Sequence, residues 1–267
     1  MSLKRQADIL QAVREHGSRS IVDLAARLSV STETIRRNIQ ALVESGALLR
    51  FHGGVMVPEQ SQEPPFQRRM QVNRDAKRAV AAIVRDIVRD GDSLILDNGT
   101  TSVYVADALV NHSRLVVVTH SAEIACRLAS RNGNRVFMAG GELRGEDAAA
   151  FGYSTLEFLA QFQVKYAFLS VGGITTAGEL VDFHLFEAEF SRVAMKQAQE
   201  TWVIADRTKF GREAPVKVCE LSAVDVVVAD EDPPLDFASR CQAAGVRIVT
   251  PKGLHREGEE TGETASG

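Results

Sequence analysis

Residues 29–54, SVSTETIRRNIQALVESGALLRFHGG, decide the fold of the first part of the chain. Apolar residues recur at helical spacing through Ile35, Ile39 and Leu42, so this stretch predicts an amphipathic helix. Ser31 precedes the helix and can cap its free amides, and Gly46 is the residue type that commonly ends a helix. Because the apolar side faces the core, polar residues near the helix N-terminus face outward, where a recognition helix contacts base edges in the major groove.

A hairpin and two earlier helices surround this segment. Short strands are predicted on either side of Gly53-Gly54, and helical segments at 3–17 and 20–30 precede the recognition helix. Three short helices and a hairpin are typical of a winged helix-turn-helix, so we expect a DNA-binding domain over residues 1–57. The alternative is that its paired arginines form an ordinary solvated helix face. The expected DNA contacts are Ser31, Thr32, Glu33, Thr34, Arg36, Arg37, Arg50 and His52.

Charge is distributed unevenly along the 267 residues. Residues 1–57 hold eight Lys/Arg and five Asp/Glu, a net charge of +3, whereas the whole chain carries −4, so the remainder carries −7. A basic segment joined to an acidic one fits a small DNA-contacting module attached to a part that does not touch DNA. With 45% hydrophobic and 25% charged residues, the composition is that of a globular protein long enough for two domains.

The three cysteines, Cys126, Cys219 and Cys241, are odd in number, far apart and set in apolar surroundings. They predict reduced thiols in or near the core, with neither a disulfide framework nor metal-ligand spacing. The N-terminus is charged rather than signal-like, and no apolar run reaches the ~20 residues that a membrane helix needs. We therefore expect a cytoplasmic protein with no membrane partner, no metal and no cofactor.

After residue 57 the pattern changes. Residues 58–73 hold three of the seven prolines and predict a linker. Over 74–251, short β-branched runs alternate with helical stretches, which predicts an α/β domain with a mostly parallel sheet covered on both faces. Residues 252–267 are polar, acidic and glycine-rich, and predict a disordered tail. The expected strands lie at 93–97, 114–119, 135–140, 166–172, 201–206, 224–230 and 246–250.

Parallel α/β sheets bind ligands beyond the carboxyl ends of their strands, and several of these ends are polar here. The first expected strand runs into DNGTT (97–101), where a helix N-terminus and threonine hydroxyls suit a phosphate. Arg144 could neutralise the ligand, carboxylates could hold hydroxyls, and Lys209 could pair with a phosphate. Alternatively, each loop is an ordinary capped turn. The expected ligand contacts are Asp97, Asn98, Gly99, Thr100, Thr101, His120, Ser121, Gly140, Gly141, Arg144, Gly173, Glu187, Lys196, Asp206 and Lys209.

Taken together, these motifs resemble the DeoR family of bacterial sugar-catabolism repressors. The resemblance covers about residues 3–232 and rests on SVSTETIRR, GALLRFHGG, DNGTT, VVVTHS, MAGGELR and ADRTKFG. It implies an N-terminal winged helix-turn-helix and a C-terminal sensor domain that resembles ribose-phosphate isomerase and CoA-transferase-like folds. It also implies that a phosphorylated sugar or polyol releases the protein from operator DNA. Four further stretches, ALVNHSRL, AGGELR, STLEFLAQF and GELVDFHLFE, favour glycerol 3-phosphate as this effector.

The chain departs from the family pattern at two positions. Asn38 follows the paired arginines where most members have Asp, which affects how the arginines are held and hence the operator sequence. His120 follows the strand at 114–119 where most members have Asn, which affects ligand preference or the response to pH.

Two other classes of function stay open at this stage. The first is an isomerase-like enzyme with an appended DNA-binding domain. Such isomerases carry a DGADE-type acidic strand end and a KGGG-type lysine loop, where this chain has SVGGITTAGELV (170–181), although Glu187 and Lys196 could still transfer protons. The second is an assembly protein with a vestigial DNA-binding domain. For a repressor we expect a homo-oligomer, a dimer or a tetramer, because one winged helix contacts too few bases to select a genomic site.

Overall fold

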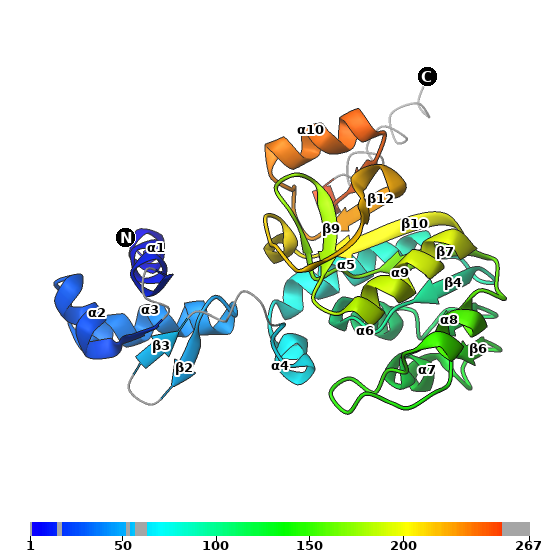
Figure 1. Cartoon of the computed structure of the whole chain (residues 1–267), viewed down its shortest axis with the longest axis horizontal. Coiled ribbons are helices and arrows are strands. Elements are labelled where there is room, and N and C mark those ends of the chain that lie inside the picture. Colours follow the sequence, from blue (N-terminus) through cyan, green and yellow to red (C-terminus); the bar gives the residue numbers. More distant parts are fainter. Residues whose placement is uncertain (1, 15–17, 52–53, 57–62, 253–267) are drawn as a thin grey trace, which may run out of the picture. The chain divides into compact units, whose positions relative to one another are not determined.

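The computed structural model describes residues 2–14, 18–51, 54–56 and 63–252. The chain divides into two compact units, residues 1–73 and 74–267, whose elements are labelled in Figure 1.

The described residues between 2 and 56 of the first unit form three helices and a small antiparallel sheet. The helices are α1 (Ser2–Arg14), α2 (Ile21–Arg27) and α3 (Thr32–Glu44), and the sheet has the order β1 (Ser18–Ser20), β3 (Gly54–Met56), β2 (Leu49–Phe51). Apolar residues of all three helices and of the hairpin bury one core, including Ile9, Leu24, Ile35, Leu48 and Val55. The predicted recognition helix and hairpin are confirmed. The third strand, β1, was not expected, because three residues are too few to show a period.

Helix ends in this unit form as the sequence predicts. The Ser31 hydroxyl accepts a hydrogen bond from the Thr34 amide at 3.2 Å, and the Ser20 hydroxyl accepts one from the Asp23 amide at 3.0 Å. Gly46 has a φ of +77°, so it provides the left-handed residue that ends α3. These local bonds fix where the recognition helix begins and ends.

The expected linker contains a short helix, α4 (Phe66–Gln71). The Arg69 side chain of this helix bonds the residues just before it: it pairs with Glu63 at 3.0 Å and donates to the Pro64 carbonyl at 3.0 Å. Part of the expected linker, 58–62, and nearly all of the expected tail, 253–267, lie outside the described residues.

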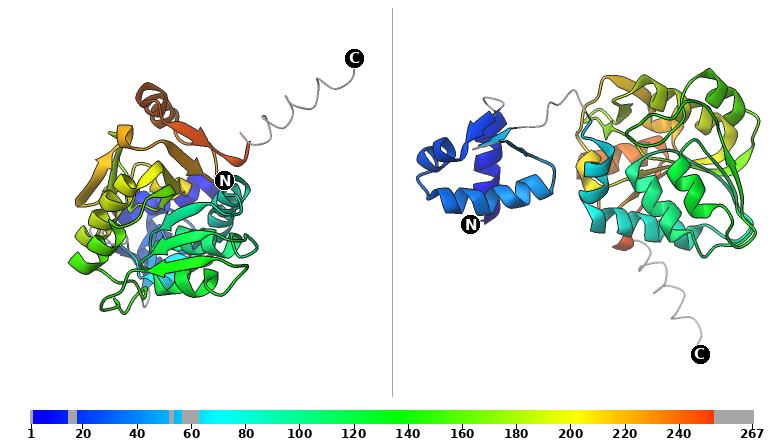
Figure 2. Two further views of the ribbon diagram at one scale, coloured as in Figure 1. Left: turned by 90° about the vertical axis from the view of Figure 1, so that its right-hand side faces the viewer. Right: turned by 90° about the horizontal axis from the view of Figure 1, so that it is seen from below.

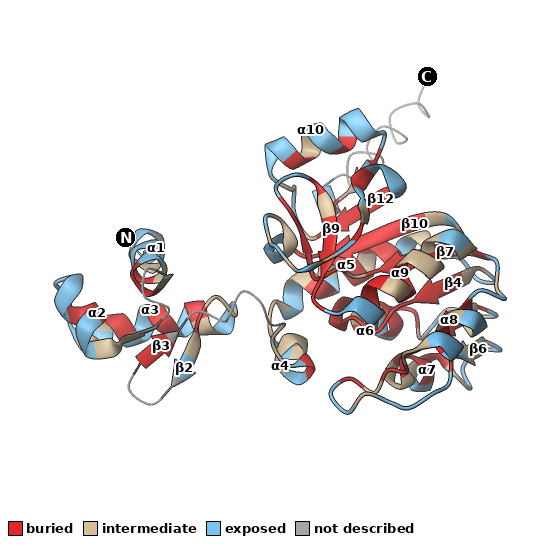
Figure 3. Cartoon of the chain, in the orientation of Figure 1, coloured by how far each residue is buried: buried red, intermediate tan, exposed pale blue. Residues whose placement is uncertain are grey.

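The second unit contains a seven-stranded sheet with the order β13-β12-β10-β7-β4-β5-β6, in which every neighbouring pair is parallel. This confirms the predicted α/β class, and all seven expected strands form. Most residues of the five central strands are buried, as the red strands in Figure 3 show, whereas the edge strands β6 and β13 are half-buried or exposed. The strands are β4 (Ser93–Leu96), β5 (Val116–Thr119), β6 (Arg135–Met138), β7 (Val164–Leu169), β10 (Ala198–Ala205), β12 (Val226–Ala229) and β13 (Arg247–Val249).

Helices lie on both sides of this sheet (Figure 2, left). On one side α5 and α6 pack together and contact β10, and on the other α9 packs with α8 and contacts β7 and β10. The helices of this unit are α5 (Arg74–Ile87), α6 (Thr100–Ala108), α7 (Ala122–Leu128), α8 (Tyr153–Leu159), α9 (Leu185–Gln197) and α10 (Leu235–Ala244). No helix in the described ranges is long and apolar enough to cross a membrane.

A second, antiparallel sheet was not expected from the sequence. It has the order β11 (Val216–Glu220), β9 (Glu179–Asp182), β8 (Gly173–Ile174). Its strands are short and interrupted, with a register shift between Lys217 and Cys219, so the alternation is weak. The cysteine prediction is also partly wrong: Cys241 is buried and Cys219 half-buried, but Cys126 is exposed, because it lies on the outer side of α7.

Candidate functional site

The outward side of α3 carries the predicted DNA contacts. Arg36 and Arg37 are exposed, whereas Ile35, Asn38 and Ile39 between and beside them are buried. Arg36 lies 3.7 Å from Glu33, an exposed pair that costs little to separate. The two arginines are therefore available for a partner.

Several neighbouring polar residues have structural contacts instead. The Ser31 and Thr34 hydroxyls are 2.9 Å apart within the helix cap. The Asn38 amide donates to the Thr34 carbonyl at 2.8 Å, so this departure from the family pattern lies inside the helix packing. Thr32 is half-buried and Glu33 is exposed at the same helix end.

The hairpin is tied to α3 through a residue that sequence reasoning missed. Arg50 on β2 donates to the Gln40 side chain at 3.0 Å, and Gln40 donates to Glu44 at 2.6 Å. Gln40 lies on the polar side of α3, where no pattern distinguishes it from a solvated glutamine. His52 lies outside the described residues.

In the second unit, the strand order brings the predicted ligand loops together. Leu96 is in register with Phe168 on one side and Thr119 on the other, and Thr119 is in register with Met138. The loops that follow β4, β5, β6 and β7 therefore leave the same edge of the sheet side by side. Their buried polar residues include Asn98, Thr100, Thr101, His120 and Ser121.

Asp97 holds the turn after β4 and is not free to contact a ligand, contrary to our expectation. Its carboxylate accepts hydrogen bonds from the Gly99 amide (3.1 Å), the Ser170 amide (2.6 Å), the Ser170 hydroxyl (2.9 Å) and the Ser102 hydroxyl. Burial raises the pKa of Asp97 to about 6, although these donors lower it. All of its acceptor positions are used within the protein.

Two glycines predicted as ligand contacts are also required by packing. A Cβ on Gly99 would lie 1.7 Å from the Ser170 hydroxyl, and a Cβ on Gly173 would lie 2.3 Å from the Arg212 carbonyl. In contrast, Gly140 has nothing within 4 Å of a Cβ, and Gly140 and Gly141 are both exposed.

The first turn of α6 keeps the features of an anion site. Gly99 is its N-cap residue and provides no side-chain cap, so the first amides of this nine-residue helix are not bonded by a cap side chain. The buried hydroxyls of Thr100 and Thr101 lie in the same turn. Ser121, by comparison, caps α7 by accepting from the Ile124 amide at 3.3 Å.

Arg144 lies in a charged cluster at this edge, which we define as Asn98, Arg144, Asp147 and Glu187. The Arg144 guanidinium bonds both carboxylates, with Nε 3.0 Å from Asp147 Oδ1, and the Asn98 amide donates to Asp147 at 2.6 Å. Burial raises the pKa of Asp147, but the bonds and charge of Arg144 outweigh it and hold this pKa low. Arg144 therefore pairs with two carboxylates inside the protein, and its contact with a ligand stays a prediction.

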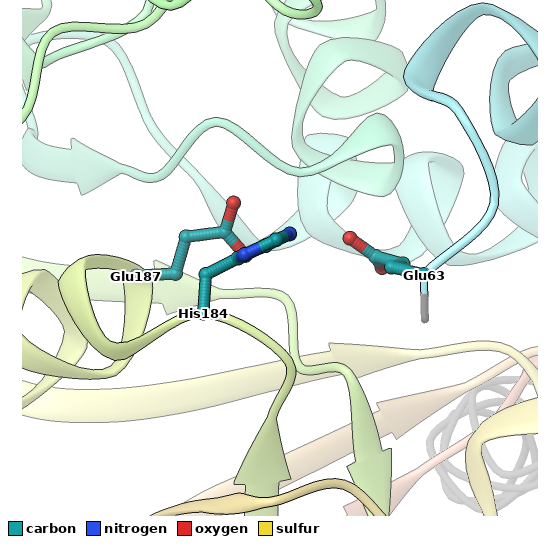
Figure 4. Close-up of side chains that lie close together, drawn as sticks. All are labelled: Glu63, His184 and Glu187. Atoms are coloured by element: carbon teal, nitrogen blue, oxygen red, sulfur yellow. The ribbon is translucent and has the colours of Figure 1, made fainter. Parts of the chain in front are cut away.

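Asp147 was missed by sequence reasoning, because it lies within a loop (GEDAAA) rather than at a strand end. Glu187 comes from the first turn of α9, whose N-cap residue is the exposed His184; Figure 4 shows these two side chains beside each other. Burial and like charge alone would disfavour both carboxylates, so Arg144 is what makes the cluster stable.

The remaining predicted residues divide between the two edges of the sheet. Asp206 and half-buried Lys209 follow β10 at the ligand edge, where the Asp206 carboxylate caps a short turn by accepting from the Thr208 amide at 2.9 Å. Lys196 is exposed and directly precedes β10, so it lies at the opposite edge, and its prediction as a ligand contact is wrong. The sequence shows Lys196 only as near Glu187 on one helix, whereas the helix separates them by more than two turns.

A winged helix-turn-helix combined with a parallel α/β unit that has a buried polar ligand edge defines a DNA-binding regulator that responds to a small molecule. Residues 5–61 match the DeoR-like helix-turn-helix domain and residues 72–231 match the DeoR C terminal sensor domain. The chain belongs to the DeoR family of transcriptional repressors.

Two curated relatives support this assignment. The Glycerol-3-phosphate regulon repressor of Escherichia coli K12 is 35% identical over 87% of this chain and 92% of that protein. The HTH-type transcriptional repressor CsqR, from the same organism, is 34% identical over 93% of this chain and 95% of that protein. A solved ribose 5-phosphate isomerase A from Methanocaldococcus jannaschii matches 52% of this chain and 55% of that chain, with 20% identity and a TM-score of 0.38.

Proposed function

We propose that this chain represses a carbohydrate or polyol catabolic operon and leaves its operator when a phosphorylated sugar or polyol binds the second unit. Glycerol 3-phosphate is the first candidate effector, because the name of one relative with 35% identity refers to it. As a DNA-binding repressor, the protein would work in the cytoplasm of its bacterial cell.

The observation that carries this proposal is the group of buried polar side chains at one sheet edge. Asn98, Thr100, Thr101 and His120 come from the ends of two adjacent strands, and Glu187 comes from α9. Burying a polar side chain destabilises a fold unless the side chain forms hydrogen bonds. Several buried polar side chains at the carboxyl ends of neighbouring strands therefore favour a binding site over ordinary turns.

The edge offers different chemistry to the two ends of such an effector. The uncapped first turn of α6, with Thr100 and Thr101, suits the phosphate, and Lys209 follows the strand two positions away. The Glu187 carboxylate accepts hydrogen bonds, so it suits a hydroxyl and would repel a phosphate. Asp147 is already bonded by Arg144, Asn98 and the Ala149 amide, so it adds negative charge rather than a ligand contact. The charged cluster therefore favours the hydroxyl end.

The same contacts disfavour the enzyme alternative. A general base needs a carboxylate or lysine that can reach the substrate and exchange protons near neutral pH. Arg144 holds the pKa of Asp147 low and also binds Glu187, while Lys196 lies at the other edge of the sheet. We therefore propose that the second unit binds its ligand without converting it.

Repression and release require an oligomer in this proposal. Two recognition helices on a symmetric dimer or tetramer would contact a palindrome with half-sites one or more helical turns apart. The effector would then act by binding the DNA-free form more tightly than the DNA-bound form, because only differential affinity can shift the equilibrium.

Two measurements test the proposal. A thermal-shift screen should identify a phosphorylated sugar or polyol that stabilises the protein, by about 2.7 kcal/mol at a hundredfold excess over Kd, while its unphosphorylated parent does not. The same compound should release the protein from DNA taken from upstream of its own operon, measured by fluorescence anisotropy.

Variants of the proposed phosphate contacts, with a lysine at the opposite end of the sheet as control, test where the phosphate binds. Thr100→Val and Lys209→Ala should bind operator normally but need more effector for release, whereas Lys196→Ala should respond like the unsubstituted protein. If no phosphate ester changes operator binding, or if the protein turns one over at catalytic concentration, the proposal is wrong.

A further inference from the structure

His120 directly follows β5 and is completely buried in the second unit. Its ring stacks on Phe190, with centroids 3.7 Å apart and planes 8° apart, and contacts the edge of Phe151 at 4.9 Å. Its Nδ1 lies 2.9 Å from the Ala150 carbonyl oxygen. These contacts hold the ring in one orientation.

The carbonyl contact determines which nitrogen carries the proton. A carbonyl oxygen only accepts, so Nδ1 must be the donor, and in the neutral ring Nε2 is a bare acceptor. Burial lowers the pKa of His120 to about 4, although the Ala150 bond and the charges of Glu187 and Asp147 raise it, and Arg144 lowers it further. The ring is therefore neutral near pH 7.

Nε2 is buried and has no hydrogen-bond partner in the described part of the chain. Leaving such a buried acceptor unbonded destabilises the fold, so an unpaired nitrogen at a ligand edge points to an absent donor. No protein donor is needed for folding here, because Nδ1 already fixes the ring.

A second buried polar atom without a partner among the described residues borders the same loop. The Thr155 hydroxyl lies 4.0 Å from where a Cβ on Gly141 would stand, and that position is 3.6 Å from the Ala150 side chain. Ala150 is the residue whose carbonyl holds His120. Two unsatisfied groups beside one segment are more consistent with a site than with a single packing defect.

We propose that His120 Nε2 accepts a hydrogen bond from a hydroxyl of the effector, and that this contact distinguishes a hydroxylated phosphate ester from a plain alkyl phosphate. The inference rests on the proposed function and specifies the hydroxyl end of its ligand. Phosphate oxygens of the dianion only accept, so they cannot bond Nε2, whereas a sugar or polyol hydroxyl donates.

Two substitutions separate the acceptor from the ring. In His120→Asn the amide nitrogen can occupy the place of Nδ1 and bond Ala150, but nothing reaches the place of Nε2. In His120→Gln the longer side chain brings an amide oxygen to the place of Nε2. Both variants lose the stacked ring, and only His120→Asn keeps a donor for the Ala150 carbonyl, so a greater loss of selectivity in His120→Asn than in His120→Gln reports on the acceptor.

The probes are glycerol 3-phosphate, n-propyl phosphate and inorganic phosphate, titrated calorimetrically into the full-length protein. For the unsubstituted protein, glycerol 3-phosphate should bind at least about fivefold more tightly than n-propyl phosphate, consistent with one satisfied buried hydrogen bond. His120→Asn should lose this ratio, and His120→Gln should keep most of it.

Each other outcome decides against the inference. An unchanged ratio in His120→Asn, or an equal loss in both variants, would show that the Nε2 acceptor does not select the hydroxyl. Equal affinity of the unsubstituted protein for the two esters would show that no hydroxyl site exists, with the phosphate site intact. Failure of all three probes to bind, together with failure of every phosphate ester to release operator, would overturn the proposed function as well.

Discussion

Replacing Arg144 with Met should destabilise the second unit strongly. The guanidinium pairs with Asp147, whose side chain is 1% exposed, and also bonds Glu187. Removing one partner of a buried ion pair leaves an uncompensated charge and costs about 3–5 kcal/mol. Because Asn98 still donates to Asp147, we expect the lower end, about 3 kcal/mol.

Arg127 provides a matched control for this prediction. Arg127 and Arg144 each pair with two carboxylates, and each of their side chains is 27% exposed. The partners of Arg127 are more exposed, at 54% for Asp107 and 28% for Glu123. Arg127→Met should therefore cost only about 0–1 kcal/mol.

Urea unfolding followed by tryptophan fluorescence measures both variants, because the single tryptophan, Trp202, lies on β10 in the second unit. In Arg144→Met, the loss should shrink toward pH 4, since Asp147 no longer has the cation that holds its pKa down and becomes neutral on protonation. Equal losses at pH 7 in the two arginine variants, or a loss independent of pH, would refute the reasoning.

Three further predictions concern other parts of the chain. Arg36→Ala and Arg37→Ala should each weaken operator binding by about 1–3 kcal/mol, with a smaller salt dependence if a phosphate contact is lost; normal binding by both would mean that α3 is not the recognition helix. Gly99→Ala should lower the melting temperature by several degrees, because its Cβ would overlap the Ser170 hydroxyl, whereas Gly140→Ala should be neutral; similar melting of the two would contradict the packing argument. Between pH 6.5 and 4 the unsubstituted protein should lose about 3 kcal/mol more stability than His120→Asn, because burial lowers the pKa of His120 to about 4 and the unfolded chain binds its proton first; parallel stability curves in urea would rule this out.

Much of the fold could be predicted from local sequence patterns. The apolar spacing of Ile35, Ile39 and Leu42 identifies α3, because a helix buries every third or fourth residue, and Ser31 and Gly46 mark its ends. The seven parallel strands are continuous apolar runs, which only a sheet covered on both faces buries. The strands of the second, antiparallel sheet were not predicted, because two to five residues, interrupted by a bulge, show no reliable alternation of apolar and polar side chains.

The sequence by itself therefore determined the two kinds of unit, the recognition helix and the set of loops at the ligand edge, because each depends on residues close together in the chain. Only the tertiary structure decided what individual side chains do. Asp97 meets Ser170, and Arg144 meets Glu187, across gaps of 73 and 43 residues, and these contacts turn a predicted ligand carboxylate and a predicted ligand cation into internal partners. Lys196 was misplaced for the same reason: a helix that crosses a parallel sheet carries its two ends to opposite edges, so nearness in sequence does not mean nearness at the site.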